Sequence, residues 1–248
     1  MSKGKLKWWS VLVWLLLWQA LSMYIGQAIL LVSPVLVIKR LSELVFQVKF
    51  WQAVFSSFWH IAAGFLLATV LGVLLASLAA RFRRIEEFLA PAMLVIKATP
   101  VASIIILVLI WISSRNLSIF ISFLMVLPII YTNVLKGICS TDIKLLEMAD
   151  IFQISQYRRI VYIYISQVMP FFQSACSIGL GLSWKSGIAA EVIGIPQGSI
   201  GEQLYQAKVY LATPDLFAWT LTIIIISIIF ERLFMLAIRF SFNRLERM

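Results

Sequence analysis

The chain has 248 residues, of which 62% are hydrophobic and 13% charged, and its formal net charge is +10. Soluble domains are about 45–50% apolar and about 25% charged, so this composition excludes an ordinary water-soluble protein and indicates a membrane protein. The positive charge does not indicate a nucleic-acid partner, because its distribution follows the positive-inside rule of membrane proteins.

Six stretches lack Asp, Glu, Lys and Arg and predict six membrane spans. They are Trp8–Ile38, Phe50–Ala80, Ala98–Ser114, Asn116–Leu135, Ile160–Trp184 and Leu216–Phe230. A spanning helix needs about 17–25 residues, which the last stretch reaches only by continuing past Glu231 and Arg232. The apolar runs do not alternate with polar residues, as the strands of a membrane barrel do. We therefore expect an all-α polytopic fold with residues 1–248 in one transmembrane domain.

The first half of the chain predicts two spans joined by an external helix. The first span, near Trp8–Val32, is too long for a cleaved signal peptide. Pro34 can open a new segment after Ser33, and Val35–Phe50 reads as an amphipathic external helix lying near the interface. The second span, near Val54–Ala80, ends at a cluster of arginines.

Prolines then predict the shape of spans three and four. Pro91 and Pro100 flank a short apolar stretch within Ile85–Thr99, which predicts a bent or partly re-entrant entry to span three. We expect a tight outer turn at Ser113–Asn116 and a kink at Pro128 in span four.

With the N-terminus inside, most Lys and Arg, including Lys3, Lys5, Lys7 and Lys97, fall on the cytoplasmic side. Both termini are therefore predicted to be cytoplasmic.

The longest cytoplasmic segment, about Lys136–Arg159, contains a predicted amphipathic helix, Asp142–Gln153. Its polar stripe consists of Lys144, Glu147, Asp150 and Gln153, and its apolar face of Leu145, Leu146, Ala149 and Phe152. A helix that lies on lipid would carry Lys and Arg along its polar face, whereas two of these four polar positions are acidic. This favours docking on a protein, with Ala149 permitting close approach, Phe152 as an anchor and Glu147 as a directional charge.

Span five, about Ile160–Ile195, carries two rows of small residues. One row, Ala175, Gly179, Ser183 and Gly187, leads to Glu191, and the other, Ser177, Gly181, Lys185 and Ala189, lies nearly opposite. Such rows allow either close helix packing or a role in lining a pathway. Because charges inside spans are costly and often functional, Ser183, Lys185, Gly187 and Glu191 are candidate pathway residues. Lys185 could attract an anionic substrate or be held by another helix.

Other activities find little support in the sequence. Residues Gly179–Ser186 nearly match a phosphate-binding loop, but Trp184 replaces the glycine before the lysine and the segment is apolar, so we expect no ATP site here. The single histidine, His60, has no partners in sequence that suggest a metal site or a hydrolase. A secondary transporter or channel remains an alternative, although it would normally show two similar halves.

The cytoplasmic segment resembles a known family. Glu147-Met148-Ala149, then Tyr157-Arg158-Arg159, then Pro170 resemble the "EAA" coupling loop of the permeases of ATP-binding-cassette (ABC) importers. The run Gly179–Gly194 is similar to the fifth span of the nitrate, sulfonate and taurine branch of the type I family. The resemblance covers residues 53–240, with the loop at 136–160. Gln153 stands where the family has a glycine, and Ser166 where it usually has a proline.

The resemblance implies a role and a set of partners. The chain would be the permease subunit of a bacterial importer in the cell membrane and would work on a small anionic solute delivered by an external binding protein. It would pair with a second copy of itself. A cytosolic ATPase dimer would hold ATP and Mg²⁺ and dock on Glu147, Ala149, Asp150, Phe152, Gln153 and Arg158. No cofactor or metal would bind to this chain.

Overall fold

The computed structural model describes residues 8–27 and 29–246, and in this part of the chain it is helical and contains no strand. The helices are α1 (Trp8–Ile25), α2 (Pro34–Val45), α3 (Val48–Arg81), α4 (Arg83–Ala98), α5 (Val101–Val108), α6 (Ser114–Cys139), α7 (Ile143–Ile151), α8 (Gln156–Arg159), a π-helical turn (Ile160–Tyr164), α9 (Ile165–Gly194), α10 (Ile200–Val209) and α11 (Thr213–Glu246). This confirms the predicted all-α class. The basic residues Lys3, Lys5 and Lys7 lie outside the described residues.

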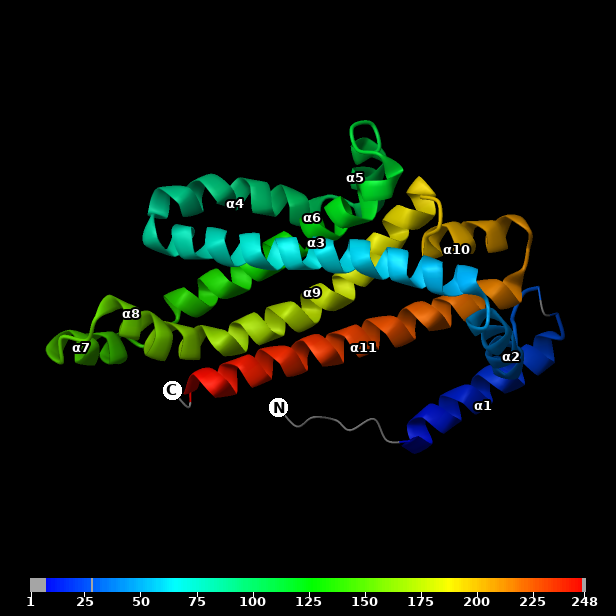
Figure 1. Ribbon diagram of the computed structural model, residues 1–248, viewed down its shortest axis with the longest axis horizontal. Coiled ribbons are helices and arrows are strands. Elements are labelled where there is room, and N and C mark those ends of the chain that lie inside the picture. The colour runs from blue at the N-terminus through cyan, green and yellow to red at the C-terminus, as the bar shows by residue number, and fades with distance from the viewer. Residues whose placement is uncertain (1–7, 28, 247–248) are drawn as a thin grey trace.

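The long helices lie roughly along one axis, with α6 packed against both α3 and α9 (Figure 1). Helix α11 packs on α9, α10 and α2. Helices α7 and α8 and the end of α11 lie at one end of the molecule, and α2 and α10 lie at the other (Figure 1). We call these the α7 end and the α10 end.

The centre of the bundle depends on close helix approach. A Cβ atom added to Gly187 of α9 would lie 2.6 Å from Ile61 of α3 and 2.6 Å from the hydroxyl of Ser122 on α6. Only a residue without a side chain allows the three helices to meet here, because a Cβ atom would overlap both neighbours. Membrane helices gain much of their association energy from such close contacts. Gly181, on the other row of α9, has no atom within 4 Å of an added Cβ.

The N-terminal region follows the predicted order, with different boundaries. Helix α1 ends at Ile25, before the predicted Val32, because Gly26 adopts the left-handed conformation (φ 64°) that commonly ends helices. Ser33 caps α2 by accepting a hydrogen bond from the Leu36 amide. Pro34 occupies the first turn, so the predicted start of a new segment at Pro34 is confirmed. The α2 side chain of Arg40 pairs with Asp215 at the start of α11, and this raises the pKa of Arg40 above its ordinary value.

The third span is shorter than predicted. It was expected over Ala98–Ser114 with a bent entry, but the helix α5 covers only Val101–Val108, and α4 and α5 are bent by 103° at a break that contains Thr99 and Pro100. Proline disfavours helical geometry in the residue before it and removes a backbone donor, so the predicted bend at this position is confirmed. Helix α5 is too short to cross a membrane alone, so any crossing here includes α4.

The chain after α9 forms a further short helix at the α10 end. Gly201 and Glu202 lie in the first turn of α10. Ser199 caps this helix by accepting a hydrogen bond from the Glu202 amide at 3.0 Å. A serine three residues before a glutamate is a known start signal for helices, and it was overlooked in the sequence.

Up to four of the six predicted spans have a counterpart of sufficient length and hydropathy in the described part of the chain. In the described part of the chain, α3, α6 and α11 are long and apolar enough to cross a membrane, and the bent α4–α5 pair makes a fourth candidate. Helix α9 has 30 residues, but its serines, glutamines and charged residues lower its mean hydropathy. The prediction that α11 continues past Glu231 and Arg232 is confirmed, whereas six crossings remain a prediction.

We predict that Gly187→Val destabilises the bundle while Gly181→Val does not. Overfilling a packed core costs about 1–3 kcal/mol, which lowers the unfolding midpoint by roughly 2–12 °C in a chain of this size. The measurement is the thermal unfolding of the two purified variants in detergent. Equal midpoints would show that α9 does not pack as described.

Candidate functional site

The loop at the α7 end has the predicted helix and a well-defined turn. Asp142 caps α7 by accepting the Lys144 amide at 2.9 Å. After α7, Gln153 is left-handed (φ 50°) and its amide donates to the Asp150 carbonyl at 3.0 Å, while the Ile154 amide donates to the Ala149 carbonyl at 2.9 Å. This is the bonding pattern of a Schellman turn, usually made by glycine. The sharp turn therefore forms although Gln153 replaces the glycine of related loops.

The apolar face of α7 is turned towards the rest of the chain. Ala149 is fully buried, and Leu145 and Leu146 are partly buried. Ala149 therefore serves packing inside the chain and is not accessible to a partner. Asp150 is exposed and pairs with Arg159 at 2.6 Å, which ties α7 to α8.

The outer surface of the loop combines charged and large apolar side chains. Glu147, Gln153 and Arg158 are exposed as predicted for a docking surface. Phe152 was assigned to the apolar face with Ala149, but it is 72% exposed. Ile143, Ile151 and Tyr157 are also exposed and were not singled out in the sequence. Ile143 and Ile151 flank Glu147 at a spacing of four residues, which places them on its face of the helix and could have revealed them.

The loop is continuous with α9. Arg159, Ile160, Tyr164 and Ile165 all have right-handed helical geometry, so α8, the π-helical turn and α9 form one rod over residues 156–194. At 1.5 Å per residue, the rod is about 58 Å long. It joins the exposed loop to the α10 end of the molecule.

Three of the four candidate pathway residues lie in the packed interior. Ser183, Gly187 and Glu191 are buried together with the rest of their row. The Ser122 hydroxyl of α6 donates to the Ser183 carbonyl at 3.1 Å. Lys185, on the opposite row, is exposed. The row that contains Glu191 therefore packs helices, and Lys185 is the candidate that faces outward.

Glu191 connects three helices at the α10 end. Its carboxylate, in a side chain only 1% exposed, accepts hydrogen bonds from the Ser57 hydroxyl of α3 at 2.6 Å and from the Gly201 amide of α10 at 3.2 Å. The Ser57 hydroxyl in turn accepts the Ile200 amide at 2.9 Å. A buried carboxylate needs such donors, and the first amides of a helix supply them with a favourable dipole. We call this set the Glu191 latch.

The latch also requires Gly201. A Cβ atom added there would lie 2.2 Å from the Glu191 Cβ and 2.6 Å from the Val192 amide nitrogen. Any side chain at this position would push α10 away from α9. Ser57 and Gly201 were not identified in the sequence, where Ser57 lies 134 residues from Glu191.

A polar cavity of about 420 Å³ adjoins the latch. Its walls come from α3, α6, α9 and the segment before α10, and its lining residues are Ser56, His60, Ser114, Arg115, Ser118, Glu191, Pro196, Gln197 and Ser199. The Nδ1 atom of His60 lies 2.6 Å from the Ser56 carbonyl and must carry the proton, because a carbonyl only accepts.

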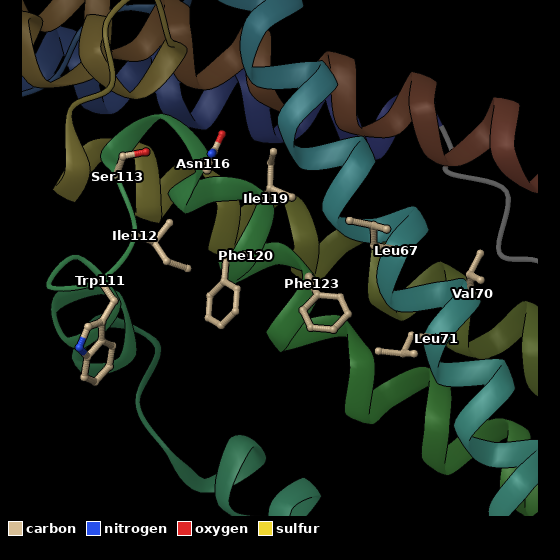
Figure 2. Close-up of a pocket in the computed structure, with 10 residues that line it drawn as sticks. All are labelled: Leu67, Val70, Leu71, Trp111, Ile112, Ser113, Asn116, Ile119, Phe120 and Phe123. Carbon is tan, nitrogen blue, oxygen red and sulfur yellow. The ribbon is translucent and has the colours of Figure 1, made fainter.

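A larger hollow, of about 780 Å³, is apolar. Figure 2 shows leucine and valine side chains of α3 and phenylalanines of α6 facing it, with Trp111 at one side. Ser113 and Asn116 are its main polar residues. Such a lining suits lipid chains or another apolar helix and offers a charged solute no compensation for lost water.

Comparisons with known proteins match the chain to transport permeases. The family described as "Binding-protein-dependent transport system inner membrane component" matches residues 68–247, more than half of the chain. A putative aliphatic sulfonates transport permease protein of Bacillus subtilis (strain 168) is 25% identical over 205 residues, covering 82% of this chain and 74% of the relative. A bicarbonate transport system permease protein of Synechococcus elongatus is 23% identical over 145 residues, covering 58% and 52%. A riboflavin transport system permease protein of Chloroflexus aurantiacus is 25% identical over 234 residues, covering 90% and 87%.

We predict that Ser57→Ala loosens α10. The substitution removes one donor to Glu191 and leaves the Ile200 amide without its acceptor, at a cost of about 1–3 kcal/mol. Amide hydrogen exchange over residues 200–209 should accelerate by at least about fivefold, since 1.4 kcal/mol corresponds to a factor of ten. Ser56→Ala is the matched control, because this neighbouring serine lines the cavity without bonding Glu191. Unchanged exchange in Ser57→Ala would show that the latch does not hold α10.

Proposed function

The chain belongs to the family of binding-protein-dependent transport system inner membrane components, and we propose that it is the permease subunit of an ATP-driven importer. As an ABC transporter permease it is a transport component of the membrane and not a catalytic subunit. In this proposal ATP and Mg²⁺ bind to a separate cytosolic ATPase dimer. The chain itself carries no cofactor.

The exposed loop that continues into α9 is the observation that carries this proposal. Glu147, Phe152 and Arg158 offer a partner two charges and a large apolar side chain. The Schellman turn and the Asp150–Arg159 pair hold α7 against α8, so a force on α7 reaches the rod. The ATPase dimer would move the loop when it closes on ATP, and α9 would carry that movement towards the Glu191 latch.

The proposed orientation places the α7 end in the cytoplasm. The end of α11 lies at the same side (Figure 1), so the C-terminal region is cytoplasmic in this arrangement. Arg81, Arg83 and Arg84 also lie where α3 passes into α4, and the positive-inside rule favours the cytoplasm for them. The α10 end then faces the external binding protein. The membrane is that of a bacterial cell.

The proposed pathway runs between two copies of the chain. Lys185 is an exposed charge about nine residues, or about 13 Å, from the outer end of α9, which is a costly position in lipid. It is better accommodated in a water-filled pathway, where it would favour a small anionic solute. Two of the relatives are named for sulfonates and bicarbonate, which supports an anion, and a third is named for riboflavin. We propose a sulfonate-like anion as the solute.

We predict that Glu147→Arg uncouples ATP hydrolysis from uptake. Reversing an exposed charge leaves membrane insertion intact but opposes a complementary charge on the ATPase, so uptake should fall at least about tenfold. The measurement is the uptake of methanesulfonate by proteoliposomes that contain the full transporter and its binding protein, with ATP hydrolysis followed in parallel.

Glu86→Arg is the control, because Glu86 is an exposed acidic residue of α4 at the same end. Normal uptake by Glu147→Arg would contradict the docking assignment. Uptake by the chain alone, without ATPase and ATP, would favour a secondary transporter or channel.

A further inference from the structure

A groove of about 530 Å³ lies along the α7 half of α11, beside α9. It is lined by Ser177, Ile228, Glu231, Arg232, Met235, Leu236 and Arg239. On α11, Ile228, Arg232, Leu236 and Arg239 follow the spacing of a single helical stripe. Two arginines therefore alternate with apolar residues along one side of a helix.

The arginines are available to a ligand. Both are exposed, and among the described residues neither forms an ion pair. The nearby carboxylate of Glu231 instead accepts a hydrogen bond from the Ser177 hydroxyl of α9 at 2.6 Å. Glu231 thus faces α9. The groove keeps a net positive charge.

The two arginines lie on α11 at the level expected for the lipid headgroups. The apolar part of α11 is only 6% buried within the chain, and Phe230, Phe234 and Ile238 form its inward face. From Thr213, Arg232 lies about 28 Å and Arg239 about 39 Å along the helix. The hydrocarbon core is about 30 Å thick, so a helix that enters it at Thr213 brings Arg232 to the opposite boundary and Arg239 into the headgroup layer.

We propose that this groove binds one anionic phospholipid from the leaflet at the α7 end. Arg232 and Arg239 would hold its phosphate, and an acyl chain would lie along Ile228, Met235 and Leu236. Guanidinium groups suit phosphate oxygens, and basic pockets beside membrane helices attract anionic headgroups. A zwitterionic lipid would bring its own cation to a groove that is already positive, so phosphatidylglycerol binds in preference to phosphatidylcholine.

The test compares two double variants of the full chain in nanodiscs. Arg232→Gln with Arg239→Gln removes the proposed site, and Arg81→Gln with Arg84→Gln removes two exposed arginines from the same end of the molecule. Phosphatidylglycerol retained on the protein is counted by native mass spectrometry, and unfolding midpoints are recorded with and without this lipid. We expect about thirtyfold weaker lipid binding in the first variant, from about 1 kcal/mol for each arginine. We also expect loss of its lipid-induced stabilisation, with the control unchanged.

Several outcomes would overturn the proposal. Equal losses in the two variants would indicate general charge attraction, and stabilisation by inorganic phosphate alone would indicate a simple anion site. Dissociation of a dimer of the first variant in phosphatidylcholine would identify the groove as an interface between copies. Should that variant fail to fold, the single substitution Arg239→Gln must still weaken phosphatidylglycerol binding about fivefold, from the loss of about 1 kcal/mol.

Discussion

The buried carboxylate of Glu191 is the constraint on which the arrangement of the α10 end depends. A charge inside a bundle of apolar helices is stable only where donors surround it. Ser57 of α3 and the first amides of α10 provide these donors, and Gly201 allows the close approach that they require. One side chain thus fixes α3, α9 and α10 relative to one another.

The same helix that carries Glu191 reaches the opposite end of the molecule. The rod over residues 156–194 passes without a break from the exposed loop to the latch, and Gly187 fits it closely between α3 and α6. The protein interior around the rod is closely packed, and packed interiors rearrange in discrete steps and not by continuous deformation. A displacement at one end of the rod is therefore transmitted to its other end. This gives a physical route by which an ATPase at the loop would control access at the α10 end.

Local features of the fold could be predicted from the sequence. The new segment that begins at Pro34, the break at Pro100 and the helix after Asp142 depend on neighbouring residues and are all present. The partners of Glu191 could not be predicted, because the register between α3 and α9 arises from packing between distant segments. The outward position of Phe152 likewise depends on where α7 meets the chain, which its helical period does not specify. Family resemblance identified the loop, and the structure assigned its buried and exposed sides.

We predict that α8 and α9 move as one rod when nucleotide binds to the proposed ATPase partner. Spin labels at Tyr157→Cys and Ile193→Cys, about 54 Å apart along the rod, would test it in a chain whose Cys139 and Cys176 are replaced by serine. A third label at Trp59→Cys reports the position of α3. Pulsed electron spin resonance should show an unchanged 157–193 distance on ATP binding and an altered 59–193 distance. A changed 157–193 distance with a constant 59–193 distance would show that α8 and α9 do not move as one rod.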